Sequence, residues 1–198
     1  TLESRGLGDV YKRQELNYPF SGKGKFILKT INRFSGIDWG TKDMAIAYDT
    51  WWNTRNRKSY VFNPSNPNIK PKIISDRNYQ DTYSDPGNFL RSRNEFNRSV
   101  LKMHYGNIFL RGQGFSPSGQ FPFIDKVNTK TFEKTRVYQS SYTDKIESII
   151  DYDPKKNQLT VSIESPSEYP NYYTKKIKSG KLEKLTNLKN PFLELQNC

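Results

Sequence analysis

One stretch of this sequence occurs twice, and the repetition limits the possible folds more than any other feature. Residues 112–137 and residues 164–186 each contain Ser-Pro-Ser, then a proline before an apolar run, then a tight turn and a short charged segment. The two copies are offset by about 50 positions, and a period of roughly 40–50 residues built from short strands is typical of β-propeller blades. A single four-stranded blade cannot bury both of its faces, so blades stack on one another.

We therefore predict an all-β fold, a partial β-propeller of antiparallel four-stranded blades. The chain has 198 residues, and at about 45 residues per blade this length allows about three to four blades. Alternating and apolar runs favour strands of half-buried sheets. The predicted strands are residues 37–40, 44–49, 58–62, 72–74, 132–137, 145–152, 158–164 and 182–186. The residues expected in the core of the 99–110 segment are Val100, Met103, Tyr105 and Ile108 to Leu110.

The two ends of the chain are predicted to differ from this domain. Residues 1–14, TLESRGLGDVYKRQ, resemble translated sequencing-adapter sequence of the kind found at the ends of metagenomic reading frames. The run that carries this resemblance is Leu7 to Gln14. We treat residues 1–14 as a non-native leader and exclude them from the fold prediction, as one would a tag. The partial propeller is then expected over residues 15–192, and residues 193–198 are expected to be a truncated tail.

Charge is the second informative property. The chain carries 32 Lys and Arg against 20 Asp and Glu, a formal net charge of +12. Such an excess favours an acidic substrate or nucleic acid as partner, although scattered charges are also typical of an ordinary solvated surface. Arg91, Arg93 and Arg98 form a local basic cluster that could receive a carboxylate, and they are the predicted substrate-binding residues.

Few residues are available for catalysis. His104 is the single histidine and lies in an alternating run that predicts a strand; Cys198 is the single cysteine and ends the chain. Ser116 lies in Gly-Phe-Ser-Pro-Ser-Gly, whose glycines are too far apart for a nucleophile elbow and which no helix pattern follows. We predict no catalytic residue and no cofactor in this chain.

A metal site is not predicted either. Asp76, Asp81 and Asp85 lie in one irregular segment, but the spacing of a calcium-binding loop, with its glycine and distal glutamate, is absent. An Asx-turn loop is the better interpretation of this segment. No apolar run reaches the length of a membrane-spanning helix, and no membrane association is predicted.

Four runs of the sequence resemble the N-terminal propeller of the prolyl oligopeptidase (S9) family of serine peptidases, and specifically its glutamyl endopeptidase branch. The four occur in the family's order and extend over most of the chain. They are AYDTWWNTR at 47–55, YSDPG at 83–87, GQGFSPSGQFPFID at 112–125, and ESPS with PNYY at 164–173, which leads to LTN at 185–187.

The resemblance implies a function that lies in a longer parent protein. In this family the propeller covers a C-terminal α/β-hydrolase domain, which holds the Ser, Asp and His of the triad, and the propeller restricts access of substrates. None of the triad positions falls in this chain. The resemblance thus implies a non-catalytic fragment of a hydrolase that cleaves peptides after glutamate, with a peptide substrate and the hydrolase domain in cis as partners. The compartment is not predicted, although a bacterial parent could be periplasmic or secreted.

The alternative is a stand-alone basic binding module for acidic peptides or nucleic acid. Aromatic and basic residues interleave in residues 51–58, WWNTRNRK. Stacking platforms with flanking cations bind single strands in this way. Packing of the two tryptophans at a blade edge explains the same residues, so nucleic acid is the less favoured partner.

Overall fold

The structure is a computed structural model, and it describes residues 11–191. These residues form nineteen strands joined by turns, and no helix occurs among them. In this part of the chain there is accordingly no helix long and apolar enough to span a membrane. The described chain divides into two compact units: residues 11–81 together with 91–101 form the first, and residues 82–90 together with 102–191 form the second.

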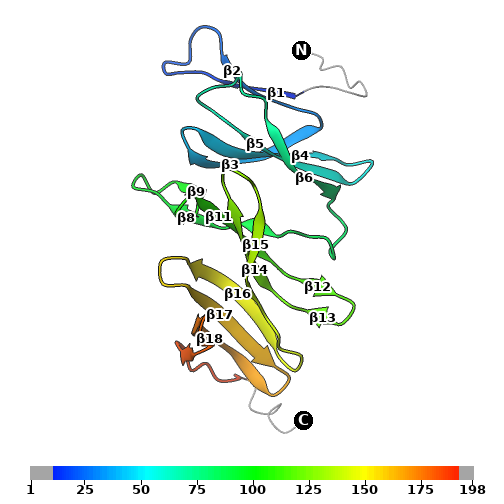
Figure 1. Cartoon of the computed structure of the whole chain (residues 1–198), viewed down its shortest axis with the longest axis vertical. Helices are drawn as coiled ribbons and strands as arrows, with labels where there is room; N and C mark the ends of the chain where they lie inside the picture. Colours follow the sequence, from blue (N-terminus) through cyan, green and yellow to red (C-terminus); the bar gives the residue numbers. More distant parts are fainter. Residues whose placement is uncertain (1–10, 192–198) are drawn as a thin grey trace. The chain divides into compact units, whose positions relative to one another are not determined.

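The first unit is built on a four-stranded antiparallel sheet in the order β3-β4-β5-β6 (Figure 1). Its strands are β3 (Arg33–Thr41), β4 (Met44–Trp51), β5 (Asn56–Phe62) and β6 (Lys72–Asn78). Each strand pairs with the next one along the chain, as a short connection between antiparallel strands allows. The strands predicted at 37–40, 44–49, 58–62 and 72–74 are confirmed.

Two hairpins complete the first unit. The first joins β1 (Tyr11–Glu15) to β2 (Lys25–Thr30), and the second joins β8 (Arg91–Arg93) to β9 (Ser99–Leu101). β4 is buried on both faces, since Met44 and Ile46 are buried as well as Ala45 and Ala47. One apolar cluster lies on the face that Ala45 and Ala47 share with alternate residues of β5. Its buried members are Leu28, Ala45, Ala47, Tyr60 and Phe62.

The second unit contains two sheets. One has the order β10-β11-β14-β15, with β7 also paired to β11; the other has the order β16-β17-β18-β19. The strands of the first are β7 (Asn88–Phe89), β10 (Met103–His104), β11 (Asn107–Gly112), β14 (Phe123–Asn128) and β15 (Lys134–Gln139). Those of the second are β16 (Ile146–Asp153), β17 (Gln158–Ser165), β18 (Glu168–Lys176) and β19 (Leu182–Lys184).

The two sheets of the second unit share one apolar core. Phe109 and Ile124 from β11 and β14 pack with buried residues of β16 and β17, and the rings of Phe109 and Tyr152 meet edge to face at 5.2 Å. Figure 1 shows β16, β17 and β18 running side by side as one curved sheet. Burial of a large apolar side chain stabilises a fold by about 1.5–3 kcal/mol, so this shared core contributes to holding the two sheets together.

The repeated stretch has the same place in both sheets of the second unit. In both sheets Ser-Pro-Ser forms the turn between the second and third strands of the order given above: between β11 and β14 in one sheet, and between β17 and β18 in the other. In the first copy the turn joins the small hairpin β12 (Phe115–Ser116) and β13 (Gly119–Gln120), which extends β11 and β14; in the second it joins β17 to β18. The two serine hydroxyls of each copy lie 3.0 Å and 3.3 Å apart. The internal repeat is therefore a structural repeat.

The copies differ at their prolines. Pro122 precedes β14, as predicted, but Pro170 lies inside β18 rather than before an apolar strand. The register between β17 and β18 shifts between Ile163 and Ser165, so the proline is close to an irregularity in the ladder. Proline lacks the amide hydrogen that a regular ladder needs, and such irregularities are where sheets accept it.

Two other predictions are wrong in part, and a third lies partly outside the described residues. Tyr105 is 90% exposed and not in the core, because it lies with positive φ in the turn before β11. The strand predicted at 132–137 begins only at Lys134, since Phe132 also has positive φ in the preceding turn. Of the predicted leader, residues 11–14 belong to β1, whereas residues 1–10 and the predicted tail at 193–198 lie outside the described residues; that both ends are non-native or truncated stays a prediction.

Candidate functional site

The three arginines predicted to bind substrate lie on the hairpin β8–β9 of the first unit. Arg91 and Arg93 alternate on β8 and so share one face, and Arg98 lies in the turn before β9; all three are exposed. The Arg93 guanidinium donates to the backbone carbonyl of Asn97 at 2.9 Å. The hairpin thus carries all three cations, and for Arg93 it also supplies an acceptor of its own.

Arg91 has a partner from a different strand. Its Nη2 lies 2.6 Å from Oδ1 of Asp38, whose side chain is only 5% exposed. The Tyr48 hydroxyl donates to the other carboxylate oxygen of Asp38 at 2.7 Å. Burial, and then the hydrogen bond to Asp38, raises the pKa of Tyr48 well above its usual range. This group is a satisfied buried carboxylate that ties β8 to β3 and β4.

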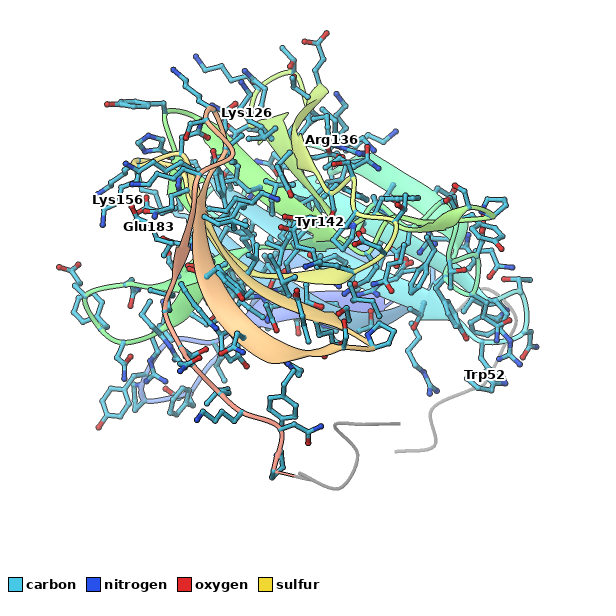
Figure 2. The ribbon with its side chains drawn as sticks, turned by 90° about the horizontal axis from the view of Figure 1, so that it is seen from below. Trp52, Lys126, Arg136, Tyr142, Lys156 and Glu183 are labelled. Atoms are coloured by element: carbon cyan, nitrogen blue, oxygen red, sulfur yellow. The ribbon has the colours of Figure 1, made fainter. Side chains whose placement is uncertain are left out.

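A pocket of about 410 Å³ lies at the opposite part of the same sheet, where β4 turns into β5. It is lined by Thr50, Trp52, Arg57 and Tyr79, and we call it the Trp52 pocket. Trp52 is 71% exposed, and Figure 2 shows its side chain on the outer side of the ribbon. The Arg55 guanidinium lies over the indole ring, 3.7 Å from its centroid. This distance is within the range of a cation–π interaction.

The tight turn from β4 to β5 builds this arrangement. Residues 52–55 connect the strands, Arg55 adopts positive φ of 55°, and its amide donates to the Trp52 carbonyl at 3.2 Å. Arg57 then enters β5 directly opposite Thr50 on β4 and Arg77 on β6. The interleaved aromatic and basic residues at 51–58 were predicted from sequence, but the contribution of Tyr79 from after β6 was not.

Other buried acidic groups are held by partners within their own unit. Asp49 is fully buried and accepts hydrogen bonds from the Tyr60 hydroxyl at 2.6 Å and the Asn32 amide at 2.8 Å. Glu147 accepts from Lys175 at 2.8 Å and from the Tyr138 hydroxyl. Burial and this contact raise the pKa of Tyr138 far above its ordinary value. Both buried carboxylates are therefore hydrogen-bonded, as buried polar groups in folded proteins usually are.

His104 and Ser116 are not brought together. His104 lies on β10, as predicted, and its ring packs against Tyr105 at 4.2 Å, with no hydrogen bond from the imidazole within residues 11–191. The Ser116 hydroxyl donates to the Gly119 carbonyl at 3.0 Å within its own turn. Neither residue has the partners of a nucleophile–base pair.

The acidic residues of the irregular segment are also used locally. Asp76 pairs with Lys58 at 2.5 Å, and Asp85 accepts from the Gly87 amide at 2.9 Å, which confirms the predicted Asx turn. Among residues 11–191 there is no group of three or more His, Cys, Asp or Glu side chains placed to hold a metal ion.

These features define the class of protein: over residues 11–191, an all-β chain of antiparallel sheets, two of them four-stranded and one five-stranded, with a cationic aromatic pocket on the first four-stranded sheet. No protein-family model matches the chain. It is 28% identical over 193 residues to a probable glutamyl endopeptidase, chloroplastic, of Arabidopsis thaliana, and 28% identical over 192 residues to the protein of the same name in Oryza sativa subsp. japonica. Each match covers 89% of this chain.

The chain is thus a distant homologue of glutamyl endopeptidases, and it spans 20% of the length of these curated relatives. Among solved structures, TolB from Acinetobacter baumannii is similar with a TM-score of 0.43 and 15% identity; the match covers 89% of this chain and 38% of that one.

Proposed function

We propose that this chain is the non-catalytic β-propeller portion of a serine endopeptidase similar to the glutamyl endopeptidases. In the proposal its sheets are blades of an incomplete propeller that limits access to a hydrolase domain in the same polypeptide. The observation that carries it is the succession of antiparallel meanders, two of which have the same Ser-Pro-Ser turn. The chain that forms them is homologous to a segment of these peptidases that makes up 20% of their length. Stacked meanders of this kind are what propeller blades require.

The intact parent protein tests this proposal. We expect it to hydrolyse short glutamate-containing peptides and to leave the same bonds intact within a folded protein, because a propeller admits only extended chains. The present chain alone is expected to hydrolyse neither substrate. Comparable cleavage of the peptide and the folded protein, or peptidase activity that remains with this chain alone, would overturn the proposal.

The proposal assigns Arg91, Arg93 and Arg98 to attraction of acidic substrates. The net charge of +12 and the exposure of the β8–β9 hairpin support this role. Charge attraction between exposed groups weakens with salt, since the Debye length is about 10 Å at 0.1 M ionic strength. In the parent, replacement of all three by Gln is expected to lower kcat/KM on glutamate peptides at low salt. The Arg93→Gln, Arg98→Gln double variant keeps the Arg91–Asp38 pair, and unchanged kcat/KM in both variants would remove the assignment.

A free-standing binding module for acidic peptides or nucleic acid is the second candidate function, and the Trp52 pocket favours it. Binding of a short oligonucleotide with strong salt dependence would support this candidate over the peptidase fragment. A hydrolase domain encoded in the same reading frame would support the first.

A further inference from the structure

The Trp52 pocket combines positive charge with an open cavity. Arg57 lines it, Arg55 covers one face of the Trp52 indole, and Arg77 lies opposite Arg57 across the β5–β6 ladder. Like charges directly opposite one another in a sheet are destabilising unless an anion or another partner offsets them. The Arg77 guanidinium donates to the backbone carbonyl of Asp81, which offsets part of this charge.

The other two arginines have no anionic partner in the described part of the chain. The Arg57 guanidinium lies 4.9 Å from the centroid of the Tyr48 ring and makes no hydrogen bond or ion pair within residues 11–191. Nη1 of Arg55 is buried and has no hydrogen-bond partner there. Buried donors without an acceptor are rare in folded proteins, because each costs the free energy of its lost hydration. Arg55 thus has a buried donor without an acceptor, and Arg57, two residues further on, is a half-buried cation that lines the pocket without an anionic partner there. Together they indicate a place for an external acceptor.

Nearby acidic side chains are already engaged. The Asp76 carboxylate receives Lys58 at 2.5 Å and the side-chain amide of Asn56 at 2.7 Å. Both contacts lower the pKa of Asp76, the one from Lys58 more strongly, so this carboxylate is ionised and committed to its own pair at neutral pH. It does not supply the anion that Arg57 and Arg55 lack.

We propose that the Trp52 pocket binds a carboxylate of a peptide, with Arg57 as its ionic contact and the indole of Trp52 packing on the adjoining chain. A guanidinium can hold a carboxylate by two parallel N–H donors, which a single point charge cannot do. The hydroxyls of Thr50 and Tyr79, which also line the pocket, can donate to the same oxygens. The carboxylate can belong to an acidic side chain or to a peptide C-terminus.

The geometry favours a peptide over a nucleic acid strand. Sequence-tolerant binding of single strands uses successive aromatic side chains with open faces, each stacking a base. Here Arg55 already covers one face of Trp52, and the pocket holds one indole beside one half-buried tyrosine. A single cavity of about 410 Å³ suits one side chain and its neighbours. This proposal is argued from the residues of the Trp52 pocket alone, and its test does not depend on the proposed peptidase role.

Nuclear magnetic resonance titration of the full chain tests the proposal. The chain has three tryptophans, and the indole N–H signal of Trp52 is assigned by its loss in Trp52→Phe. The probes are acetyl-Gly-Glu-Gly-amide, acetyl-Gly-Gln-Gly with a free C-terminus, acetyl-Gly-Gln-Gly-amide and a short oligothymidine strand. Saturable shifts of the Trp52 signal are expected with one or both carboxylate peptides, whichever source is bound, and not with the uncharged peptide.

Two substitutions locate the contact. Arg57→Gln is expected to raise Kd for the bound carboxylate peptide by about tenfold or more, the size of one charged hydrogen-bonded contact. Lys42→Gln is the matched control: it removes the same charge from an exposed side chain in the turn before β4, at the other end of that strand from Trp52, and Kd should change less than about twofold. Should Arg57→Gln not fold, Arg57→Lys keeps the charge without the planar fork and is also expected to weaken binding.

Three results would overturn the proposal. They are equal shifts with the uncharged peptide, equal Kd for Arg57→Gln and Lys42→Gln, and shifts with oligothymidine but with neither carboxylate peptide. The last result would assign the pocket to nucleic acid.

Discussion

Arg91 Nη2 lies 2.6 Å from Oδ1 of Asp38, and this contact ties the β8–β9 hairpin to the central sheet of the first unit. Asp38 is buried, and its second oxygen accepts the Tyr48 hydroxyl. An ionised carboxylate in such a place needs its cation, because an unpaired buried charge is strongly unfavourable. Arg91 therefore has a structural role in addition to any contact with a substrate.

Removing the Arg91 charge should destabilise the chain, and removing its neighbour's should not. Arg91→Gln is expected to lower the free energy of unfolding by about 1–2 kcal/mol, less than for a fully buried pair because the arginine itself is half-exposed. Arg93→Gln is the control, since Arg93 donates its hydrogen bond within its own hairpin, to the Asn97 carbonyl. Urea denaturation measures both, and equal losses would show that Asp38 does not depend on Arg91.

The buried pair Glu147–Lys175 should be among the most sensitive polar contacts of the second unit. Glu147 is 1% exposed, and its carboxylate bridges Lys175 on β18 and Tyr138 on β15. Glu147→Gln should cost about 3 kcal/mol, because Lys175, whose side chain is only 11% exposed, then lacks its counter-charge. Chemical denaturation checks this. The control is Glu168→Gln, which breaks the exposed pair with Lys145 and should leave the denaturation midpoint almost unchanged. A similar shift of the midpoint in Glu147→Gln and Glu168→Gln would contradict the prediction.

Gly114 should tolerate no side chain, whereas Gly180 should tolerate one. Both have positive φ, 63° and 67°, so any L-residue carries the same backbone penalty of about 1–2 kcal/mol. At Gly114 a Cβ would also meet the Phe121 carbonyl oxygen at 1.9 Å, but at Gly180 nothing lies within 4 Å. Thermal unfolding of Gly114→Ala and Gly180→Ala should therefore separate the two effects. Gly114→Ala is expected to lose at least about 2 kcal/mol more, and matching melting temperatures would be inconsistent with this turn.

Stability should fall with acid through Asp76. Hydrogen bonds from Lys58 and then Asn56 lower the pKa of Asp76 below its usual value near 4. A carboxyl group whose pKa is lower in the folded state contributes stability that is complete above the unfolded pKa and disappears as pH falls through the folded pKa. The free energy of unfolding, measured by urea between pH 6 and pH 2, should thus decline below about pH 4. The decline should be smaller in Asp76→Asn; an identical profile in that variant would refute the assignment to Asp76.

The strands were predictable where local pattern and long-range pairing agree. The alternating run at 158–164 forms β17, and the apolar run at 44–49 forms β4, because side chains on one face of each strand meet an apolar core. Tyr105 shows the limit of this reasoning. Its place in an alternating run predicted burial, but the chain turns there with positive φ and leaves the ring 90% exposed. A turn of this kind depends on which strands pair on either side of it.

The candidate site was likewise predictable only where its residues are close together in the sequence. The sequence pointed to the aromatic and basic residues at 51–58 and to the arginines near 91–98. It did not reveal that Asp38 engages Arg91, or that Tyr79 completes a pocket with Trp52 and Arg57. Those contacts join strands separated by many residues, and no local pattern encodes them.

By itself the sequence determined the repeated strand–turn units and the excess of positive charge, since periodicity and composition are local properties of the chain. The tertiary structure alone decided which of the positively charged side chains are paired with a carboxylate and which are available to bind an anion. The pairing of β3, β4, β5 and β6 buries the Asp38 carboxylate against Arg91 and leaves Arg57 without an anionic partner among the described residues. The physical reason is that a charge becomes a structural pair or a binding group according to what the fold places within a few ångströms of it.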